Sequence, residues 1–235
     1  MGLKKNRVAV IGIGAVGIEM LRVLKQRNFP IKELCVFARS SREIEVDGEK
    51  FQVRAISPEE FKDGDIALFA GTEGEKGASV TYAPEAIKKG TIVIDNGADF
   101  RMDPNVPLVI PEVNPQDIKK HKGIIANPNC STIQMVVALW PIYRAVGIRR
   151  VIVCSYQAVS GAGRGGVVQL ENELQGKYAA EKVFPYIINK NVIPKIGDFG
   201  DCPRDPARCL RLSFCPRSAT RSESSRCMSA LICSA

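Results

Sequence analysis

The chain has 235 residues, of which 45% are hydrophobic and 25% are charged, and its net charge is +8. This globular composition excludes a disordered chain, collagen and a coiled coil, and no apolar run reaches the about 18 residues of a transmembrane helix. Residues 1–14 lack the small-residue cleavage site of a signal peptide, which predicts a cytoplasmic protein. The basic residues are scattered, so we expect a small anionic ligand rather than a nucleic acid or a membrane as partner.

Strands and helices are predicted to alternate along residues 1–200. A compact β-branched strand at 7–11 leads through a glycine turn into a helix at 18–27. Further strands are expected at 33–37, 65–70, 91–96, 107–113, 123–128 and 149–159, a hairpin at 43–56 around Asp47-Gly48, and helices beginning at Ser57, Ala83, Asn114 and Ser131. This alternation predicts an α/β protein with a doubly wound parallel, Rossmann-type sheet.

The turn after the first strand carries the spacing of a dinucleotide site. Gly12, Gly14 and Gly17 permit a tight turn and a close approach to a pyrophosphate, and the helix that follows offers free N–H groups. After the second strand, where an NAD site usually has an acid, residues 39–42 read Arg-Ser-Ser-Arg. Two arginines and two hydroxyls suit a 2′-phosphate, so the predicted cofactor is NADP. A glycine turn kept for packing and an ordinary basic loop are the alternatives.

Cys130 is the candidate nucleophile. It follows Asn129, a typical N-cap residue, and the helical spacing after it places Cys130 in a first turn. The positive end of a helix dipole favours a thiolate, the nucleophilic form. A thiolate beside a nicotinamide indicates covalent aldehyde oxidation, in which hydride leaves to NADP and an acyl acceptor cleaves the thioester. The alternative is a small buried residue, as we expect for Cys35 and Cys154 inside strands.

This chemistry needs a base, which is usually a histidine. The single histidine, His121, lies in the lysine-rich segment 119–122, which we expect to face solvent, so we do not assign it as the base. The cysteines after residue 200 match no paired zinc spacing, and no metal site is predicted.

The composition changes near residue 200. All 20 glycines and every lysine lie in residues 1–200, whereas residues 201–235 hold five of the eight cysteines, six arginines and seven serines. The segment has no apolar period of a helix or a strand. We interpret it as an out-of-frame translation, with a disordered basic tail as the alternative. Codons can be chosen for residues 217–222 that read Val-Gly-His-Ser-Glu when moved two bases on.

Several segments together resemble aspartate-β-semialdehyde dehydrogenase over about residues 6–199. They are VAVIG…GAVG, Arg39-Ser40, VIDNGADFRMDPNVPLVIPEVNP, NPNCSTIQMV, YQAVSGAG and NVIPKIGDF. The resemblance implies NADPH-dependent reductive dephosphorylation of 4-aspartyl phosphate to aspartate 4-semialdehyde through a cysteine thioester, in the biosynthesis of lysine, diaminopimelate, threonine and methionine. It also implies a homo-oligomer.

The resemblance further implies the roles of individual residues. Cys130 resembles the nucleophile, Arg101 the residue that holds phosphate, Gln157 a substrate contact, and Asn129 a neighbour of the cysteine. The residues that match cofactor-binding positions are Gly12, Ile13, Gly14, Ala15, Val16, Gly17, Arg39, Ser40, Ser160 and Gly161.

The sequence departs from the family in two places. Only Ile13 separates the first two glycines, where the family has two residues, which puts the pyrophosphate pose in doubt. The family also continues well beyond residue 199 with a substrate-binding glutamate and arginine, a base histidine in Gly-His-Ser-Glu, and a closing helix.

We therefore predict an NADP-binding Rossmann domain at 1–127, the start of an incomplete α/β catalytic and dimerisation domain at 128–199, and an aberrant tail at 200–235. The chain as written is expected to be inactive. The alternatives are a catalytically dead NADP-binding fragment and an enzyme like N-acetyl-glutamyl-phosphate reductase.

Overall fold

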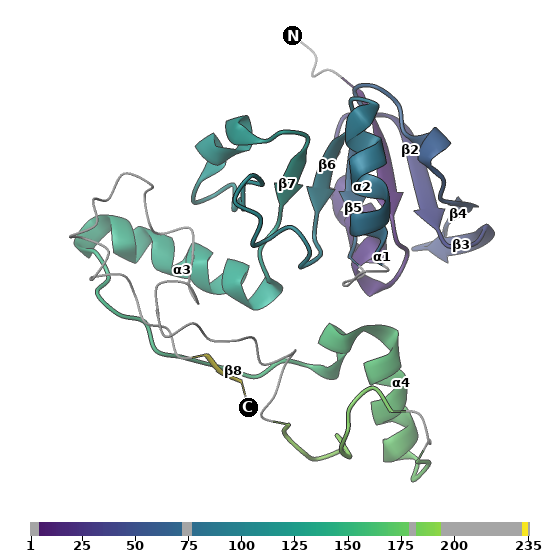
Figure 1. Cartoon of the computed structure of the whole chain (residues 1–235). Coiled ribbons are helices and arrows are strands. Elements are labelled where there is room, and N and C mark those ends of the chain that lie inside the picture. The colour runs from purple at the N-terminus through teal and green to yellow at the C-terminus, as the bar shows by residue number, and fades with distance from the viewer. Residues whose placement is uncertain (1–4, 72–76, 179–181, 194–231, 235) are drawn as a thin grey trace. The chain divides into compact units, whose positions relative to one another are not determined.

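The computed structural model describes residues 5–71, 77–178, 182–193 and 232–234. The chain divides into two compact units, residues 1–137 and 138–235, which Figure 1 shows in sequence colours. The domain boundaries predicted at residues 127 and 199 stay a prediction. No helix in the described ranges is long and apolar enough to cross a membrane.

The first unit is built on a seven-stranded sheet in the order β3-β4-β2-β1-β5-β6-β7. The strand β3 pairs antiparallel with β4, and the other neighbours pair in parallel. The strands are β1 (Asn6–Ile11), β2 (Ile31–Ala38), β3 (Arg42–Val46), β4 (Glu49–Ala55), β5 (Ile66–Phe69), β6 (Ile92–Asp95) and β7 (Ile124–Ala126). Because the chain winds outward from β1 in both directions, the predicted doubly wound, Rossmann-type sheet is confirmed.

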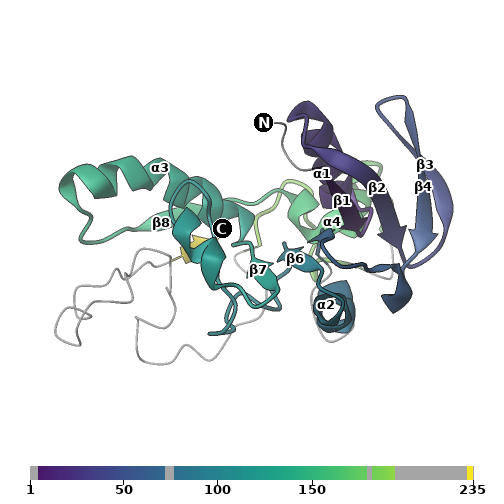
Figure 2. The same cartoon turned by 90° about the horizontal axis from the view of Figure 1, so that it is seen from above.

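Helices α1 (Ala15–Gln26) and α2 (Ala78–Lys88) cover opposite faces of this sheet (Figure 2). Alternate residues of β1 supply the two cores, because successive strand side chains point to opposite faces. Ile11 belongs to a buried cluster with Ala83 of α2, whereas Val10 belongs to a second cluster with Leu21 of α1. The central strand is thus buried on both sides, as expected of a parallel strand.

The predicted hairpin is confirmed. Its turn residues Asp47 and Gly48 have φ of 52° and 80°, the left-handed pair that a tight two-residue hairpin requires. The predicted helix at Ser57 is a single turn, η1 (Pro58–Glu60). It ends because Phe61 adopts an extended backbone and is buried against the sheet.

The strand predicted at 107–113 is wrong. Only Leu108 forms an isolated bridge, with Ala126. The chain turns instead, because the Asn114 N–H donates to the Ile110 carbonyl at 2.9 Å and the Asn114 Oδ1 accepts the Ile110 N–H at 2.8 Å. The predicted helix that follows is the short helix η2 (Pro115–Lys120).

Helix α3 (Cys130–Val146) begins one residue before the predicted start and continues into the second unit. The second unit contains β8 (Val153–Ser155), η3 (Val159–Ala162), α4 (Gly163–Leu174) and β9 (Ile232–Ser234). The strand predicted at 149–159 is reduced to β8, since only these residues pair, in parallel, with β9. Helices with a small sheet agree with the predicted second α/β domain. Apart from 232–234, the tail predicted at 200–235 lies outside the described residues.

Two buried side chains of α4 hold the segment 182–193. The Gln169 Oε1 accepts the N–H groups of 183–184 at 2.8 and 2.9 Å. The Glu173 Oε2 accepts those of 188–189, both at 2.8 Å. A hydrogen bond from Gln169, together with these backbone N–H groups, lowers the pKa of Glu173. The segment is therefore anchored by an ionised carboxylate.

Candidate active site

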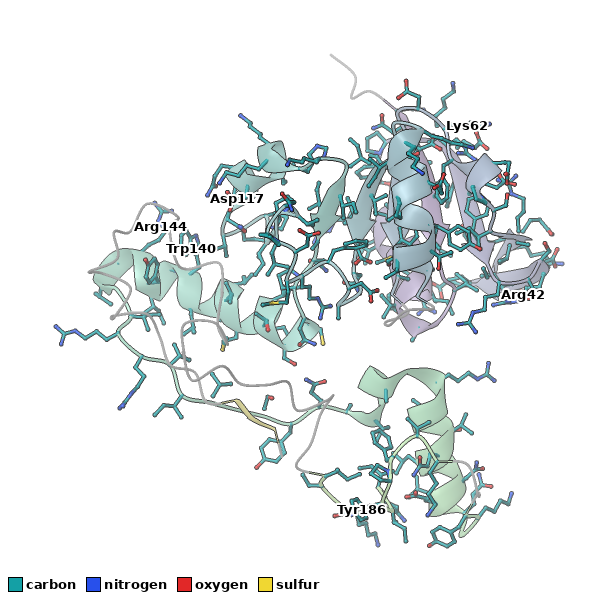
Figure 3. The ribbon with its side chains drawn as sticks, in the orientation of Figure 1. Arg42, Lys62, Asp117, Trp140, Arg144 and Tyr186 are labelled. Carbon is teal, nitrogen blue, oxygen red and sulfur yellow. The ribbon has the colours of Figure 1, made fainter. Side chains whose placement is uncertain are left out.

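The sequence-predicted residues of the first unit lie on loops that follow parallel strands. The glycine turn follows β1, residues 39–42 follow β2, Arg101 follows β6, and Cys130 follows β7. All four loops therefore belong to the carboxyl edge of the sheet, where open α/β sheets bind their ligands. Figure 3 shows the two edges in this unit, with Arg42 at the carboxyl edge and Lys62, which precedes β5, at the other.

The glycine turn fits a dinucleotide. The Gly12 N–H donates to the Phe37 carbonyl at 2.9 Å, which ties the turn to β2. Gly12 has φ of +93°, and a Cβ on Gly17 would lie 1.9 Å from the Gly12 carbonyl oxygen, so both positions require glycine. Gly14, by contrast, is exposed and has open space where its Cβ would be. The turn thus leaves room above Gly14 for a ligand at the start of α1.

The departure at Ile13 has a structural explanation. Ile13 is half-buried and packs against the core cluster of Val10 and Leu21, so it points into the protein. Ala15 and Val16, which begin α1, are exposed beside Gly14. The shorter spacing therefore does not block the open side of the turn.

The residues after β2 divide into two roles. The Ser41 Oγ accepts the Ala55 N–H at 2.9 Å and so holds the end of β4. Arg39, Ser40 and Arg42 are exposed, with the Arg42 Nη1 at 3.5 Å from the Ser40 Oγ. Both arginines and one hydroxyl are therefore accessible to an anion at this edge.

Cys130 is exposed at the start of α3. The predicted cap is confirmed, since the Asn129 Oδ1 accepts the Ser131 N–H at 3.0 Å. The Cys130 thiol lies 3.8 Å from the same Oδ1. Cys35 contrasts with it, because burial and a hydrogen bond to Glu33 raise the pKa of the Cys35 thiol. Of these two cysteines, Cys130 is the one that a solvent-borne substrate can reach. Cys154 lies in β8.

Arg101 is fixed by backbone carbonyls of two loops. Its Nε donates to the Asn127 carbonyl and its Nη2 to the Asn96 carbonyl, each at 2.9 Å. The Asn127 Nδ2 donates to the Asn96 Oδ1 at 2.6 Å, and the Asn127 N–H donates to the Asp95 carbonyl at 2.8 Å. The guanidinium therefore lies beside the short segment that leads into Cys130. Sequence reasoning missed both asparagines, although each directly follows a buried parallel strand.

Three predicted residues belong to the second unit. Gln157 follows β8, whereas Ser160 and Gly161 lie in η3. All three are exposed, and a Cβ on Gly161 would lie 3.4 Å from the Gln157 Oε1. The structure thus brings Gln157 and Gly161 together in the second unit, and in the first unit it places Arg101 beside Asn127, at the start of the segment that leads through Asn129 to Cys130.

His121 lies at the wrong edge to serve Cys130. It is half-buried immediately before β7, and its Nδ1 accepts the Gly123 N–H at 3.0 Å. Cys130 follows the opposite, carboxyl end of the same strand. Within the described residues, no group of three or more His, Cys, Asp or Glu side chains could hold a metal ion.

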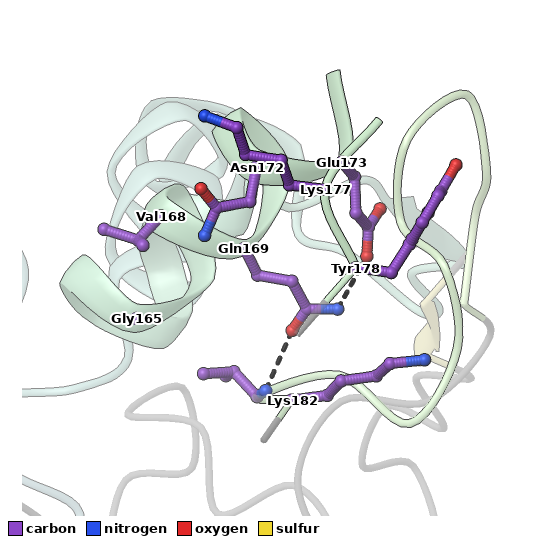
Figure 4. A pocket seen from close by; sticks show the side chains of 9 residues that line it. Gly165, Val168, Gln169, Asn172, Glu173, Lys177, Tyr178 and Lys182 are labelled. Atoms are coloured by element: carbon purple, nitrogen blue, oxygen red, sulfur yellow. Dashed lines mark hydrogen bonds between the residues drawn. The ribbon is translucent and has the colours of Figure 1, made fainter. Parts of the chain in front are cut away.

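A pocket of about 480 Å³ lies beside α4 in the second unit. Figure 4 shows the Gln169 amide at its centre, between Glu173 and the backbone that follows Lys182. Both buried side chains are engaged in holding the segment 182–193. None of the sequence-predicted site residues lines it.

A doubly wound sheet with a glycine turn between its first strand and its first helix is the arrangement of a dinucleotide-binding domain. Residues 7–121 match the NAD-binding domain of semialdehyde dehydrogenases, and residues 139–204 match the dimerisation domain of these enzymes. The chain belongs to the semialdehyde dehydrogenase family. The predicted family and the predicted dinucleotide-binding domain are thereby confirmed.

Similar proteins of curated sequence or known structure agree with this family assignment. The chain is 48% identical over 205 residues to aspartate-semialdehyde dehydrogenase of Aquifex aeolicus, covering 82% of this chain and 59% of that protein. It is 46% identical over 211 residues to the Bacillus subtilis enzyme, covering 83% and 60%. The structure of aspartate semialdehyde dehydrogenase II from Vibrio cholerae complexed with ASA superposes with a TM-score of 0.75 at 44% identity, covering 85% and 61%. The chain thus spans about three fifths of these relatives.

Proposed function

We propose that the protein acts as an aspartate-semialdehyde dehydrogenase, in which NADPH reduces 4-aspartyl phosphate to aspartate 4-semialdehyde and phosphate is released. The observation that carries the proposal is the exposed Cys130 at the capped start of α3, beside a loop on which Arg101 is fixed. Relatives that are 40–48% identical are named for this activity. The protein is further proposed to be cytoplasmic and to take no nucleic acid or membrane as partner.

Cys130 begins the reaction. Its thiolate attacks the carbonyl carbon of the acyl phosphate, the sulfur–carbon bond forms, and the carbon–oxygen bond to phosphate breaks. The exposed first turn of α3 offers backbone N–H groups and a positive dipole end to the thiolate. The product on the protein is a thioester, which hydride then converts to the aldehyde with release of the thiolate.

Arg101 holds the phosphate group. A guanidinium has five N–H donors, and two of those of Arg101 are spent on the backbone carbonyls of Asn96 and Asn127. Those that are left, on Nη1 and Nη2, can donate to phosphate oxygens in the planar, bidentate manner that suits this group. Asn129 and Gln157 are proposed to contact the substrate.

The cofactor is held by the loops after β1 and β2. The glycine turn at 12–17 would hold the pyrophosphate through backbone N–H groups, and Arg39 with Ser40 would hold the 2′-phosphate of NADP. Ser160 and Gly161 are proposed to contact the nicotinamide side. When bound, NADPH supplies the hydride that reduces the thioester.

The second unit is proposed to mediate homo-oligomer formation. It matches a dimerisation domain, and it exposes large apolar side chains. These include Ile142, Val146, Ile152 and Tyr156, which are 50–80% exposed. Apolar surface of this kind is typical of a protein interface.

For the 235-residue polypeptide itself, one observation favours a second candidate, an NADP-binding chain without turnover. His121, its single histidine, lies before β7 and accepts a backbone N–H. It is therefore not placed to serve as the base for Cys130 at the other end of that strand.

The function is tested in an extended version, in which residues from 200 onward are replaced by the corresponding part of the Aquifex aeolicus relative. We expect NADPH formation from aspartate semialdehyde, phosphate and NADP⁺, measured by absorbance. Cys130→Ala should abolish it, whereas Cys35→Ala, at a buried cysteine, should keep it. No NADPH formation by the folded extended version would contradict the proposed function, whereas full turnover in the Cys130→Ala version would show that Cys130 is not the nucleophile.

A further inference from the structure

We propose that Asn127, through its side-chain hydrogen bond to Asn96, is a positioning residue that fixes the Arg101 guanidinium for phosphate. The inference rests on the proposed function, since it assumes that Arg101 binds the phosphate group of the substrate. The two asparagines hold Arg101 through their backbone carbonyls and are proposed to act through Arg101 alone.

The two carbonyls that accept from Arg101 belong to different loops. The Asn96 carbonyl follows β6, and the Asn127 carbonyl follows β7. Both bonds from one planar guanidinium have the usual length, at 2.9 Å, so to keep both of them the two carbonyls must hold their separation and direction. Any change in the spacing of the two loops would break one bond and turn the guanidinium.

The side-chain bond between the asparagines sets this spacing. The Asn127 Nδ2 donates to the Asn96 Oδ1 at 2.6 Å, directly beside the carbonyls that hold Arg101. The backbone bond from Asn127 to Asp95 joins the loops from the strand side at 2.8 Å. Two hydrogen bonds thus join the loops. The backbone bond involves Asp95, the last residue of β6, whereas the side-chain bond joins two residues that both lie beyond the strands.

Asn96 in turn stands on a rigid base. Asp95 is fully buried, and its Oδ1 accepts both the Ser79 hydroxyl and the Gly97 N–H, the latter at 3.0 Å. These bonds fix the chain on both sides of Asn96, so the Asn96 Oδ1 is a stationary acceptor. The amide pair therefore ties the segment that begins at Asn127 to a fixed acceptor.

The predicted consequence concerns anion binding and not the thiol. Without the amide bond, the Asn127 carbonyl can shift, Arg101 loses its Nε partner, and the remaining donors no longer converge on one phosphate. Cys130 keeps its own support, because Asn129 caps α3 independently. Loss of anion binding with an unchanged thiol is therefore the signature of a positioning role.

The test uses the 235-residue chain and alkylation of Cys130, followed by mass spectrometry of the tryptic peptide 123–144, in which Cys130 is the only cysteine. Iodoacetate is an anion, so its rate of reaction with Cys130 depends on the Arg101 guanidinium as well as on the thiol. Iodoacetamide is neutral, so its rate depends on the thiol alone. Inorganic phosphate is the competitor. In the unmodified chain we expect iodoacetate to react faster than iodoacetamide, and phosphate to slow iodoacetate selectively.

Asn127→Asp replaces the donor by an oxygen that faces the Asn96 Oδ1. We expect the ratio of iodoacetate to iodoacetamide rates to fall about tenfold, the size of one lost hydrogen bond to a charged group, with phosphate protection lost. Asn96→Asp adds the same charge but keeps the acceptor, so its ratio should stay well above that of Asn127→Asp. Asn127→Ala repeats the loss without a new charge. Resistance of buried Cys35 to alkylation confirms that each variant is folded.

Two failures are distinguishable. If Arg101→Gln leaves the ratio and the phosphate protection unchanged, Arg101 holds no anion, and the proposed function loses its phosphate site together with this inference. If Arg101→Gln lowers both but Asn127→Asp and Asn127→Ala behave like the unmodified chain, the positioning role is overturned and the proposed function stands. A variant that fails to fold is replaced by Asn96→Ala, which removes the same bond from the other side.

Discussion

Arg39 is the residue on which we propose that the choice of cofactor depends. It is exposed just beyond β2, with no acidic residue between positions 38 and 42 to bind a ribose hydroxyl. We expect NADPH to bind more tightly than NADH, and Arg39→Ala to weaken NADPH about tenfold while changing NADH little, because a charge-assisted bond to phosphate is lost.

Titration of both cofactors by fluorescence measures this preference. Arg27→Ala is the matched control, since Arg27 is also exposed but follows the far end of α1. Equal affinities for the two cofactors in the unmodified chain would contradict the assignment of Arg39.

Single residues differ in how far sequence reasoning can place them. The cap by Asn129 and the first-turn position of Cys130 follow from local helix signals, and the structure agrees with both, whereas the exposure of Cys130 was left open by the sequence. The pairing of Asn127 with Asn96 joins residues 31 positions apart in the sequence. No local pattern encodes it, because it depends on β6 and β7 being neighbours in the sheet. The same holds for the two carbonyls that fix Arg101.

At the scale of elements, the turn from β1 into α1 depends on close packing at Gly17. A Cβ there would meet the Gly12 carbonyl oxygen at 1.9 Å, and that oxygen belongs to rigid backbone. We expect Gly17→Ala to lower the free energy of unfolding by at least about 1–3 kcal/mol, the usual cost of overpacking.

Urea denaturation measures the loss, with Gly14→Ala as the matched control. Gly14 has open space at its Cβ position and φ of −82°, so this change should stay within about 0.5 kcal/mol. Equal destabilisation by the two substitutions would show that steric contact at Gly17 is not the cause.

The attachment of residues 182–193 to α4 is predicted to depend on pH. Gln169 and backbone N–H groups lower the pKa of Glu173, so the ionised carboxylate stabilises the folded segment. For a lowered pKa, this stabilisation is present above the unfolded value of about 4.3 and is lost as pH falls through the folded value.

Amide hydrogen exchange at Ile188 and Asn189 is the direct measurement, since both donate to Glu173. At pH values below about 4, the protection of these two amides against exchange should decrease. At neutral pH, their protection should be weaker in Glu173→Gln than in the unmodified chain. Glu171→Gln, at an exposed position on the same helix, should leave it intact. Protection that is independent of both pH and Glu173 would contradict the ionic anchor.

The elements also show where apolar patterns mislead. Residues 107–113 have the composition of a buried strand, but only Leu108 pairs with the sheet. The turn is closed by Asn114, whose backbone and side chain both bond to Ile110. A run of hydrophobic residues indicates that a segment is buried. It does not indicate that the segment pairs with a strand, because pairing also requires a neighbouring strand with free backbone groups. The hairpin at Asp47-Gly48 was predictable because its turn residues determine the pairing themselves.

At the scale of the whole molecule, the first unit has a complete sheet with two covered faces. The second unit, by contrast, has a three-residue pairing of β8 with β9 and many exposed apolar side chains in its described part. The change of character predicted near residue 200 stays a prediction, because apart from 232–234 that part of the chain lies outside the described residues. Dehydrogenase activity is therefore to be measured on the whole 235-residue polypeptide and not on the first unit alone.

We predict that the 235-residue polypeptide has at most trace dehydrogenase activity. Cys130 and Arg101 are in place, but the single histidine lies at the opposite edge of the sheet, where its Nδ1 accepts the Gly123 N–H. General acid–base catalysis typically contributes about 10²–10⁴-fold, so turnover should rise by about this factor in the extended version that carries the relative's C-terminal part.

The comparison is made by NADPH formation from aspartate semialdehyde and phosphate in both versions, at equal concentrations of folded protein. His121→Ala should leave the extended version unchanged, because His121 is a backbone-bonded residue remote from the carboxyl edge. Comparable turnover in the two versions, together with its loss in His121→Ala, would overturn this placement of the base. Turnover confined to the extended version, and its loss in Cys130→Ala, would instead assign the thiol to this chain and the base to the relative's C-terminal part.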